Sequence, residues 1–263
     1  MTRPPATARV LLLCALSATA LPSAACSTVG RPAPRAVETP PPPPPSASGP
    51  STGRPSASPA TLTAAQARAA LITETDLGEP WVPTQGAGTW RDGLLKATTG
   101  DHDCRQLLDV LYTDELLGAP AGPRASSALD DAGTGAQLRY QVAAHRPADV
   151  DRTVAWLASL PARCGEFTAV TTRGTTVYGQ VAEVPLPQAG DARAGLRVVL
   201  SEETADGESS YLTLDAAVVR VGQDAISLTH GGYGDLPAEV AQNVAQLGAQ
   251  RLADIRQQGR VLV

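Results

Sequence analysis

The chain has 263 residues, of which 43% are hydrophobic and only 3% aromatic, and its formal net charge at pH 7 is −5. The first 60 residues hold five of the 21 basic residues and one of the 26 acidic residues, so residues 61–263 carry 16 basic and 25 acidic groups, a net charge of −9. A surface this acidic argues against binding to nucleic acid or to anionic lipid headgroups. Three distinct regions follow one another along the chain.

Residues 1–25 have the three parts of an export signal. Arg3 and Arg9 give a positive start, Val10–Ala20 forms an apolar core, and small residues follow at 23–25. The apolar core is shorter than the roughly 20 residues that a membrane-spanning helix needs. We therefore predict a cleaved signal peptide over 1–25.

The end of this leader resembles the lipobox of bacterial lipoproteins, because Cys26 directly follows small residues. In that family the leader is cleaved before the cysteine, whose thiol carries a diacylglycerol anchor. The family usually has Leu three residues before the cysteine, where this chain has Ser23, and Leu21 lies five before. The alternative is ordinary cleavage after Ala20 or Ala25, which would give a freely secreted protein.

The four cysteines favour lipidation of Cys26. Cys14 leaves with the leader, and Cys104 and Cys164 can pair with each other. Cys26 would otherwise be an unpaired, exposed thiol in an oxidising compartment. We therefore predict a lipid-anchored (diacylglyceryl, palmitoylated) protein on the extracytoplasmic face of the cell membrane.

Residues 26–60 are predicted to be a disordered tether. They contain the run Pro40–Pro45, flanked by Pro, Ser, Ala and Gly with almost no large apolar side chain. Such a composition buries too little apolar surface to offset the entropy of ordering. The proline run favours a stiff polyproline II rod, so the segment would hold a domain away from the membrane.

Residues 61–263 are long enough for one domain with a sizeable core. Thr63 and Gln66 have the spacing of a capping box, and Asp103 is a candidate N-cap for the next helix. Pro147 suits the first position of a third helix, and Pro161 is expected to end it. The predicted helices cover 63–72, 103–118, 147–161 and 236–257.

The predicted strands alternate apolar and polar side chains and are joined by turn residues. They cover 126–130, 136–144, 167–172, 175–184, 196–200, 211–221 and 225–229. Segment 76–81 is expected to be a loop that places Trp81 on the core, and 86–100 to be irregular around Trp90. Because hairpins join antiparallel strands, we predict a single α+β domain with an antiparallel or mixed sheet covered by helices.

Cys104 and Cys164 are 60 residues apart, and in an exported protein they are predicted to form a disulfide. A redox or metal-binding pair is the alternative. It has little support, since the sequence holds no Cys-x-x-Cys and no histidine next to Cys164.

Few residues point to chemistry. Asp101, His102 and Asp103 could ligate a metal, but three adjacent residues rarely converge on one ion, and we predict no metal and no cofactor. The chain lacks a Gly-x-Ser-x-Gly elbow, Ser-x-x-Lys, His-Glu-x-x-His and a phosphate-binding glycine loop, and we predict no catalytic residue.

The most glycine-dense stretch of the domain holds His230, Gly231, Gly232 and Tyr233. Glycines let a backbone approach a ligand closely, so these four residues are the candidate ligand-binding rim. The same stretch is equally explained as a turn between the last strand and the last helix.

Several segments resemble the extracellular sensor domain of mycobacterial PknH-type serine/threonine kinases. They are Asp76-Leu77-Gly78-Glu79-Pro80-Trp81, the two cysteines Cys104 and Cys164, Gly190-Asp191, and Val219-Arg220-Val221-Gly222. The resemblance covers residues 62–258 and implies a helix-covered antiparallel sheet with a ligand cleft. That domain carries two disulfides, whereas this one can form only one, so no binding residue is carried over. Lipid-anchored relatives of the domain are common in actinobacteria, which agrees with the Ala- and Arg-rich composition.

We expect a non-catalytic, lipid-anchored domain that binds or senses an unidentified small molecule. The alternatives are a structural lipoprotein that docks onto an envelope protein complex, and a cell-wall hydrolase or transferase. A deep, partly polar pocket would favour the first function and a flat apolar patch the second. Two carboxylates in a cleft, or a serine beside His230, would favour the third.

Overall fold

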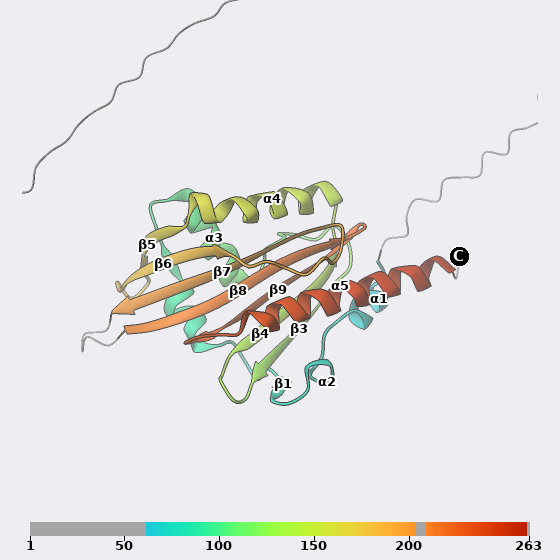
Figure 1. The fold of residues 1–263 in the computed structure, drawn as a ribbon, viewed down its shortest axis with the longest axis horizontal. Helices are drawn as coiled ribbons and strands as arrows, with labels where there is room; N and C mark the ends of the chain where they lie inside the picture. Colours follow the sequence, from blue (N-terminus) through green and yellow to red (C-terminus); the bar gives the residue numbers. More distant parts are fainter. Residues whose placement is uncertain (1–61, 204–208, 262–263) are drawn as a thin grey trace, which may run out of the picture. The chain divides into compact units, whose positions relative to one another are not determined.

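The computed structural model describes residues 62–203 and 209–261. The predicted signal peptide, Cys26 and the tether lie outside these residues. So do residues 205–208, whose Ala-Asp-Gly-Glu sequence predicts a hairpin turn. Nine strands form one sheet in the order β1-β3-β4-β9-β8-β7-β6-β5-β2. Every pairing is antiparallel, which confirms the predicted α+β class (Figure 1).

The strands are β1 (Trp81–Pro83), β2 (Ala97–Thr98), β3 (Arg124–Asp131), β4 (Gln137–Ala144), β5 (Glu166–Thr171), β6 (Thr176–Glu183), β7 (Ala192–Glu203), β8 (Ser209–Val221) and β9 (Asp224–Tyr233). The helices are α1 (Ala64–Ala69), α2 (Glu74–Leu77), the π-helix η1 (Arg91–Leu95), α3 (His102–Thr113), α4 (Pro147–Arg163) and α5 (Ala238–Val261). None of these helices is long and apolar enough to cross a bilayer.

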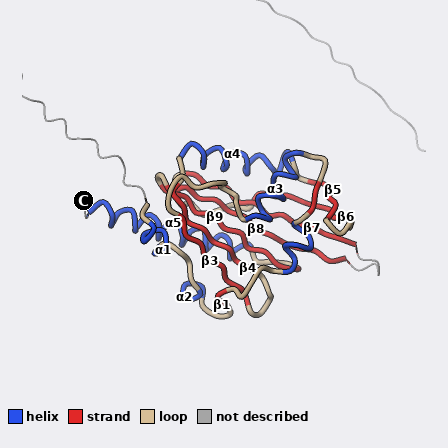
Figure 2. The backbone as a smooth tube through the Cα atoms, turned by 180° about the vertical axis from the view of Figure 1, so that it is seen from behind, coloured by secondary structure: helices blue, strands red, loops and turns tan. Residues whose placement is uncertain are grey.

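Helices cover both faces of the sheet, but each face only in part. Helix α5 crosses the face turned to the reader in Figure 1, and α3 lies on the opposite face, seen in Figure 2. Helix α4 contacts β6, β7 and β8, whereas α5 contacts β8 and β9 and α1 contacts β3 and β4. The two helical layers are therefore staggered, and they overlap at β8.

Burial along the strands follows this stagger. Strand β8 is buried almost continuously from Leu212 to Val219, because helices pack on both of its faces. Strand β6 instead alternates, with Val177 and Val181 in the core and Tyr178 and Gln180 exposed on the open face. The alternating pattern predicted a strand with one buried and one exposed face, and β6 has this arrangement.

Local capping explains where the helices begin. Thr63 and Gln66 form the predicted capping box of α1. The prediction that Asp103 caps the next helix was wrong, because the Asp101 side chain accepts from the backbone N–H groups of Asp103 and Cys104. Pro161 does not end α4, which continues to Arg163.

The segments predicted to be irregular contain short regular elements. One turn of helix (α2) precedes Gly78, whose φ of 72° reverses the chain before Trp81. Trp81 opens the edge strand β1 and packs partly buried against the core, as expected. The π-helix η1 follows Trp90, which is fully inside the core beneath α3.

Two arginines hold the long helix α5 to the rest of the domain. Arg251 donates to the carboxylate of Asp76 and to the carbonyl of Leu71, which joins α5 to the α1–α2 connection. Arg256 pairs with the buried Asp224 at the start of β9. The pairing with Arg251 holds the pKa of Asp76 well below its usual range.

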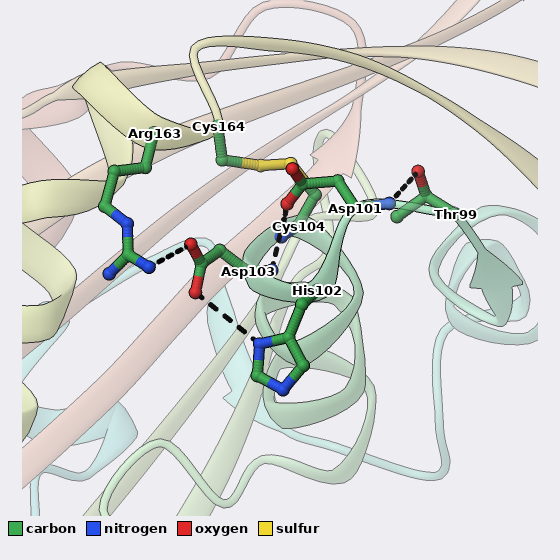
Figure 3. The surroundings of a disulfide bond; sticks show 7 residues. All are labelled: Thr99, Asp101, His102, Asp103, Cys104, Arg163 and Cys164. Atoms are coloured by element: carbon green, nitrogen blue, oxygen red, sulfur yellow. Dashed lines mark hydrogen bonds and ion pairs between the residues drawn. A yellow bond between two sulfur atoms is a disulfide. The ribbon is translucent and has the colours of Figure 1, made fainter.

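The disulfide joins the first turn of α3 to the residue after α4 (Figure 3). Cys104 and Cys164 have Cα atoms 5.4 Å apart and both side chains are buried. An Arg163–Asp103 ion pair of 2.5 Å lies beside it. The bond and the ion pair together hold the two helices that cover β5–β8.

Removing this bond is expected to destabilise the domain markedly. Closing a loop of this length lowers the entropy of the unfolded chain, and the loss is about 2–4 kcal/mol of unfolding free energy. A Cys104→Ser/Cys164→Ser variant should therefore melt roughly 5–15 °C below the wild type by differential scanning calorimetry. An unchanged melting temperature would show that the bond contributes nothing to stability.

Candidate functional site

The helices α3 and α4 leave part of their face of the sheet open over β3, β4 and β9. A hollow of about 270 Å³ lies there. Its floor comes from three neighbouring strands and its wall from the chain that leaves α3. The residues that line it include Ser126 and Ala128 (β3), Arg139 and Gln141 (β4), Ser227 and Thr229 (β9), and Asp114 and Leu116 (wall). We call this hollow the β3–β4–β9 groove.

Strand register brings the polar floor residues together. Arg139 lies opposite Ala128 on one side and Thr229 on the other, and Gln141 lies opposite Ser126 and Ser227 in the next row. Residues directly opposite each other in an antiparallel pair share a face. The same two rows continue on β8 as Ala216 and Val218, which are buried in the core beneath α3 and α4. The sheet face thus changes from polar to apolar where the helices begin to cover it.

Asp114 connects the wall of the groove to its floor. It ends α3 with a left-handed backbone (φ 58°), a conformation that Asp tolerates better than most residues. Its carboxylate accepts from the Thr229 hydroxyl at 3.3 Å and lies 3.5 Å from Nε of Arg139. Leu116, which follows it, supplies a buried apolar surface at the same wall.

A second arginine reaches Asp114 from behind the wall. Arg91 is almost fully buried, and its Nη2 atom lies 2.8 Å from Asp114 and donates to the carbonyls of Leu111 and Tyr112. Burial lowers the pKa of Arg91, and the neighbouring Asp114 opposes that shift. One carboxylate is therefore shared by two guanidinium groups.

Donors in the groove remain unused. The Nε atom of Arg139 is buried without a hydrogen-bond partner. The side chains of Ser126, Gln141 and Ser227 make no hydrogen bond with other described residues. Buried polar groups in a folded domain are nearly always hydrogen-bonded, so a buried, unpartnered Arg139 Nε on the floor of a hollow is compatible with a polar ligand there.

Comparison with solved structures finds a similarity to the extracellular domain of PknH from Mycobacterium tuberculosis. The alignment has 13% identity and a TM-score of 0.45, and it covers 76% of this chain and 100% of that one. A hypothetical protein of Helicobacter pylori aligns with 21% identity and a TM-score of 0.22, over 35% of this chain and 55% of that one. No family model matches the chain, and the search of curated proteins found no match.

The four candidate rim residues lie within β9 and form no loop. The strand continues through His230, Gly231 and Gly232 to Tyr233, four residues beyond the predicted end. Their side chains alternate between the two faces, so they do not form one rim. The expected strand end was wrong, and their role in ligand binding stays a prediction.

The two glycines of this strand accommodate neighbouring side chains. A Cβ atom at Gly231 would lie 2.8 Å from the ring of Trp90, and one at Gly232 would lie 3.0 Å from the backbone of Ala136. Close packing therefore explains why small residues occupy both positions. At Gly231 the group that approaches the backbone closely is the Trp90 side chain and not a ligand.

His230 is buried on the face opposite the groove. It lies across the β8–β9 pair from Asp215, and its ring centroid is 5.8 Å from that of Trp81. Asp215 is itself held by a bidentate pair with Arg197, at 2.7 and 2.8 Å. Burial lowers the pKa of His230, Asp215 and Asp131 oppose that shift, and Arg197 adds to it.

The other two histidines are separate from each other and from the groove. His102 is exposed and lies 3.7 Å from Asp103, while His145 is buried after β4, with a lowered pKa caused by burial. Across 62–203 and 209–261, no three His, Cys, Asp or Glu side chains gather into a metal-binding cluster.

Sequence reasoning missed the groove residues. Arg139 and Gln141 alternate with apolar residues in the predicted strand 136–144, a pattern that indicates a strand but no binding site. Ser227 and Thr229 interrupt an otherwise apolar strand, and this was the one local signal that the face of β9 is not simply core. Only the register between β4 and β9 shows that these two sets of polar residues lie side by side on one face of the sheet.

Burial of neutral His230 makes stability depend on pH. Below about pH 6.5 the unfolded chain binds a proton at this residue, while the folded chain, with its lowered pKa, does not. Stability should therefore fall as the pH drops from 6.5 toward the folded pKa, by up to about 1.4 kcal/mol per pH unit.

Denaturant titrations at pH 7 and pH 5 test this effect. In a His230→Gln variant the loss of unfolding free energy between these pH values should be clearly smaller than in the wild type, because no imidazole titrates at this position. Equal pH dependence in the wild type and the His230→Gln variant would contradict the assignment.

Proposed function

We propose that this protein is a lipid-anchored extracytoplasmic lipoprotein whose globular domain binds a small molecule in the β3–β4–β9 groove. In this proposal the domain is a non-catalytic binding or sensing module. Cys26 carries the lipid, and residues 26–60 hold the domain off the membrane. The polar, incompletely hydrogen-bonded groove is the observation that supports ligand binding most directly.

The export signal and the disulfide support the extracytoplasmic location. Residues 1–25 have the composition of a cleaved leader, and Cys26 follows small residues. Cys104 and Cys164 are bonded, and disulfides persist mainly in oxidising compartments. These features are independent of each other, since one lies in the leader and the other in the domain core.

The chemistry of the groove favours binding over hydrolysis. Asp114 is the one acidic side chain among the residues that line it, and two arginines already share its carboxylate. A glycosidase would need two carboxylates on either side of the scissile bond. His230 faces the other side of the sheet, so it cannot activate a groove serine.

Docking onto an envelope complex has less support. The exposed large apolar side chains of the described chain are Val82, Val170, Tyr178 and Tyr233, on four different strands. A protein-docking surface usually gathers apolar side chains into one larger patch. The groove, by contrast, combines a hollow shape with several polar groups.

Native mass spectrometry of protein purified from the cells that express it tests ligand binding. The wild type should retain a small molecule, and a Ser126→Trp variant should not, because the indole would fill the groove. Thr168→Trp places the same ring on an exposed position of β5 on the opposite face and is the matched control. A ligand retained equally by all three proteins, or by none, would contradict the proposal.

Mass spectrometry of the mature N-terminus tests the anchor. The first residue should be Cys26 carrying acyl chains, and a Cys26→Ser variant should lose its membrane association because it lacks the thiol that carries the diacylglycerol. An unmodified mature chain that begins at Leu21 or at Cys26 would refute lipidation while leaving ligand binding unaffected.

A further inference from the structure

The groove presents a guanidinium group whose hydrogen-bonding capacity is largely unused. Arg139 projects from the middle of the floor, with 28% of its side chain exposed. Its Nε is buried without a hydrogen-bond partner, and neither Nη atom hydrogen-bonds to a described residue. Arginine cannot lose its charge in a protein, so the positive group persists at any physiological pH.

Asp114 offsets this charge only in part. Its shortest contact is the 2.8 Å approach of Arg91 to Oδ1 from behind the wall, and the same atom accepts from the Thr229 hydroxyl on the floor at 3.3 Å. The 3.5 Å approach of Arg139 Nε to Oδ2 is too long for a good hydrogen bond. Two guanidinium groups around one carboxylate leave a local positive charge, although the domain as a whole is strongly acidic.

Neutral polar groups lie beside Arg139 on the same floor. Thr229 is its direct partner on β9, and Gln141 and Ser227 occupy the next row. Gln141 and Ser227 can donate and accept hydrogen bonds, so they suit hydroxyl, amide or ether oxygens. A hollow of about 270 Å³ is at the small end of ligand pockets, which favours a compact molecule.

We propose that the groove binds a small molecule that presents a carboxylate or phosphate group to Arg139. The planar fork of a guanidinium matches either anion through paired, charge-assisted hydrogen bonds. The polar remainder of the ligand contacts Gln141 and Ser227, and its apolar side lies against Leu116. A cationic ligand is disfavoured because it would meet Arg139, and the Asp114 carboxylate is already paired with Arg91. This inference rests on the groove being the binding site of the proposed function.

Titration with the two simplest anions tests the inference. Nuclear magnetic resonance spectra of the labelled domain are recorded with sodium acetate, sodium phosphate and, as a neutral probe, glycerol. One of the anions should shift the Arg139 Nε–Hε signal and the backbone amides of Gln141 and Ser227 in a saturable way, and glycerol should not. Stronger binding of phosphate would indicate a phosphorylated ligand, and stronger binding of acetate a carboxylate.

Three variants distinguish recognition by the planar guanidinium group of Arg139 from attraction by its positive charge. Arg139→Gln should weaken anion binding at least tenfold, measured at the Gln141 and Ser227 amides. Arg139→Lys keeps the charge without the planar fork and should bind with intermediate affinity. Arg173→Gln removes the same charge from an exposed hairpin residue and should match the wild type.

The inference is overturned if neither anion causes a saturable shift, or if the folded Arg139→Gln variant binds as tightly as the wild type. Its failure can be distinguished from failure of the proposed function. If the wild type retains a neutral ligand and Ser126→Trp loses it, the groove remains the binding site and only the inference of an anionic ligand is refuted. If Ser126→Trp still retains the ligand, the groove is not the binding site and the proposed function at this site is refuted.

Discussion

The staggered packing of helices on the two faces of the sheet is the constraint on which the rest of this structure depends. A nine-stranded sheet is too wide for the helices this chain provides, so α3 and α4 cover β5–β8 on one face while α5 and α1 cover β8, β9, β4 and β3 on the other. Strand β8, where both layers meet, is buried on both sides. The face of β3, β4 and β9 beside α3 therefore stays open and polar, and it becomes the floor of the groove.

Asp114 makes this open face a defined site. The residue ends α3, and its carboxylate meets Arg91, Arg139 and Thr229, so the wall and the floor share one ion network. The floor side chains stand on paired strands and not on a loop, which keeps their spacing rigid. The disulfide between Cys104 and Cys164 fixes the helices whose edge forms the wall. The site is thus supported by the same contacts that stabilise the fold.

Predictions from local pattern succeeded where a residue's neighbours in sequence decide its conformation. The capping box at Thr63, the helix start at Pro147 and the seven longer strands are of this kind. The short strands β1 and β2 were missed because two or three residues carry no readable period. The end of β9 was misplaced because Gly231 and Gly232 weaken strand propensity, whereas close packing against Trp90 and Ala136 requires glycines there.

The sequence by itself determined the α+β class, the identity of the two cysteines that pair, and the antiparallel sense of the longer strands, because periodicity, caps and hairpin turns act over a few residues. Only the tertiary structure decided that Arg139 lies opposite Thr229 and beside Asp114. That contact depends on the register between β4 and β9, which lie far apart in the sequence. A shift of one residue would turn every one of these side chains to the other face. The groove is therefore a property of long-range pairing, which no local pattern encodes.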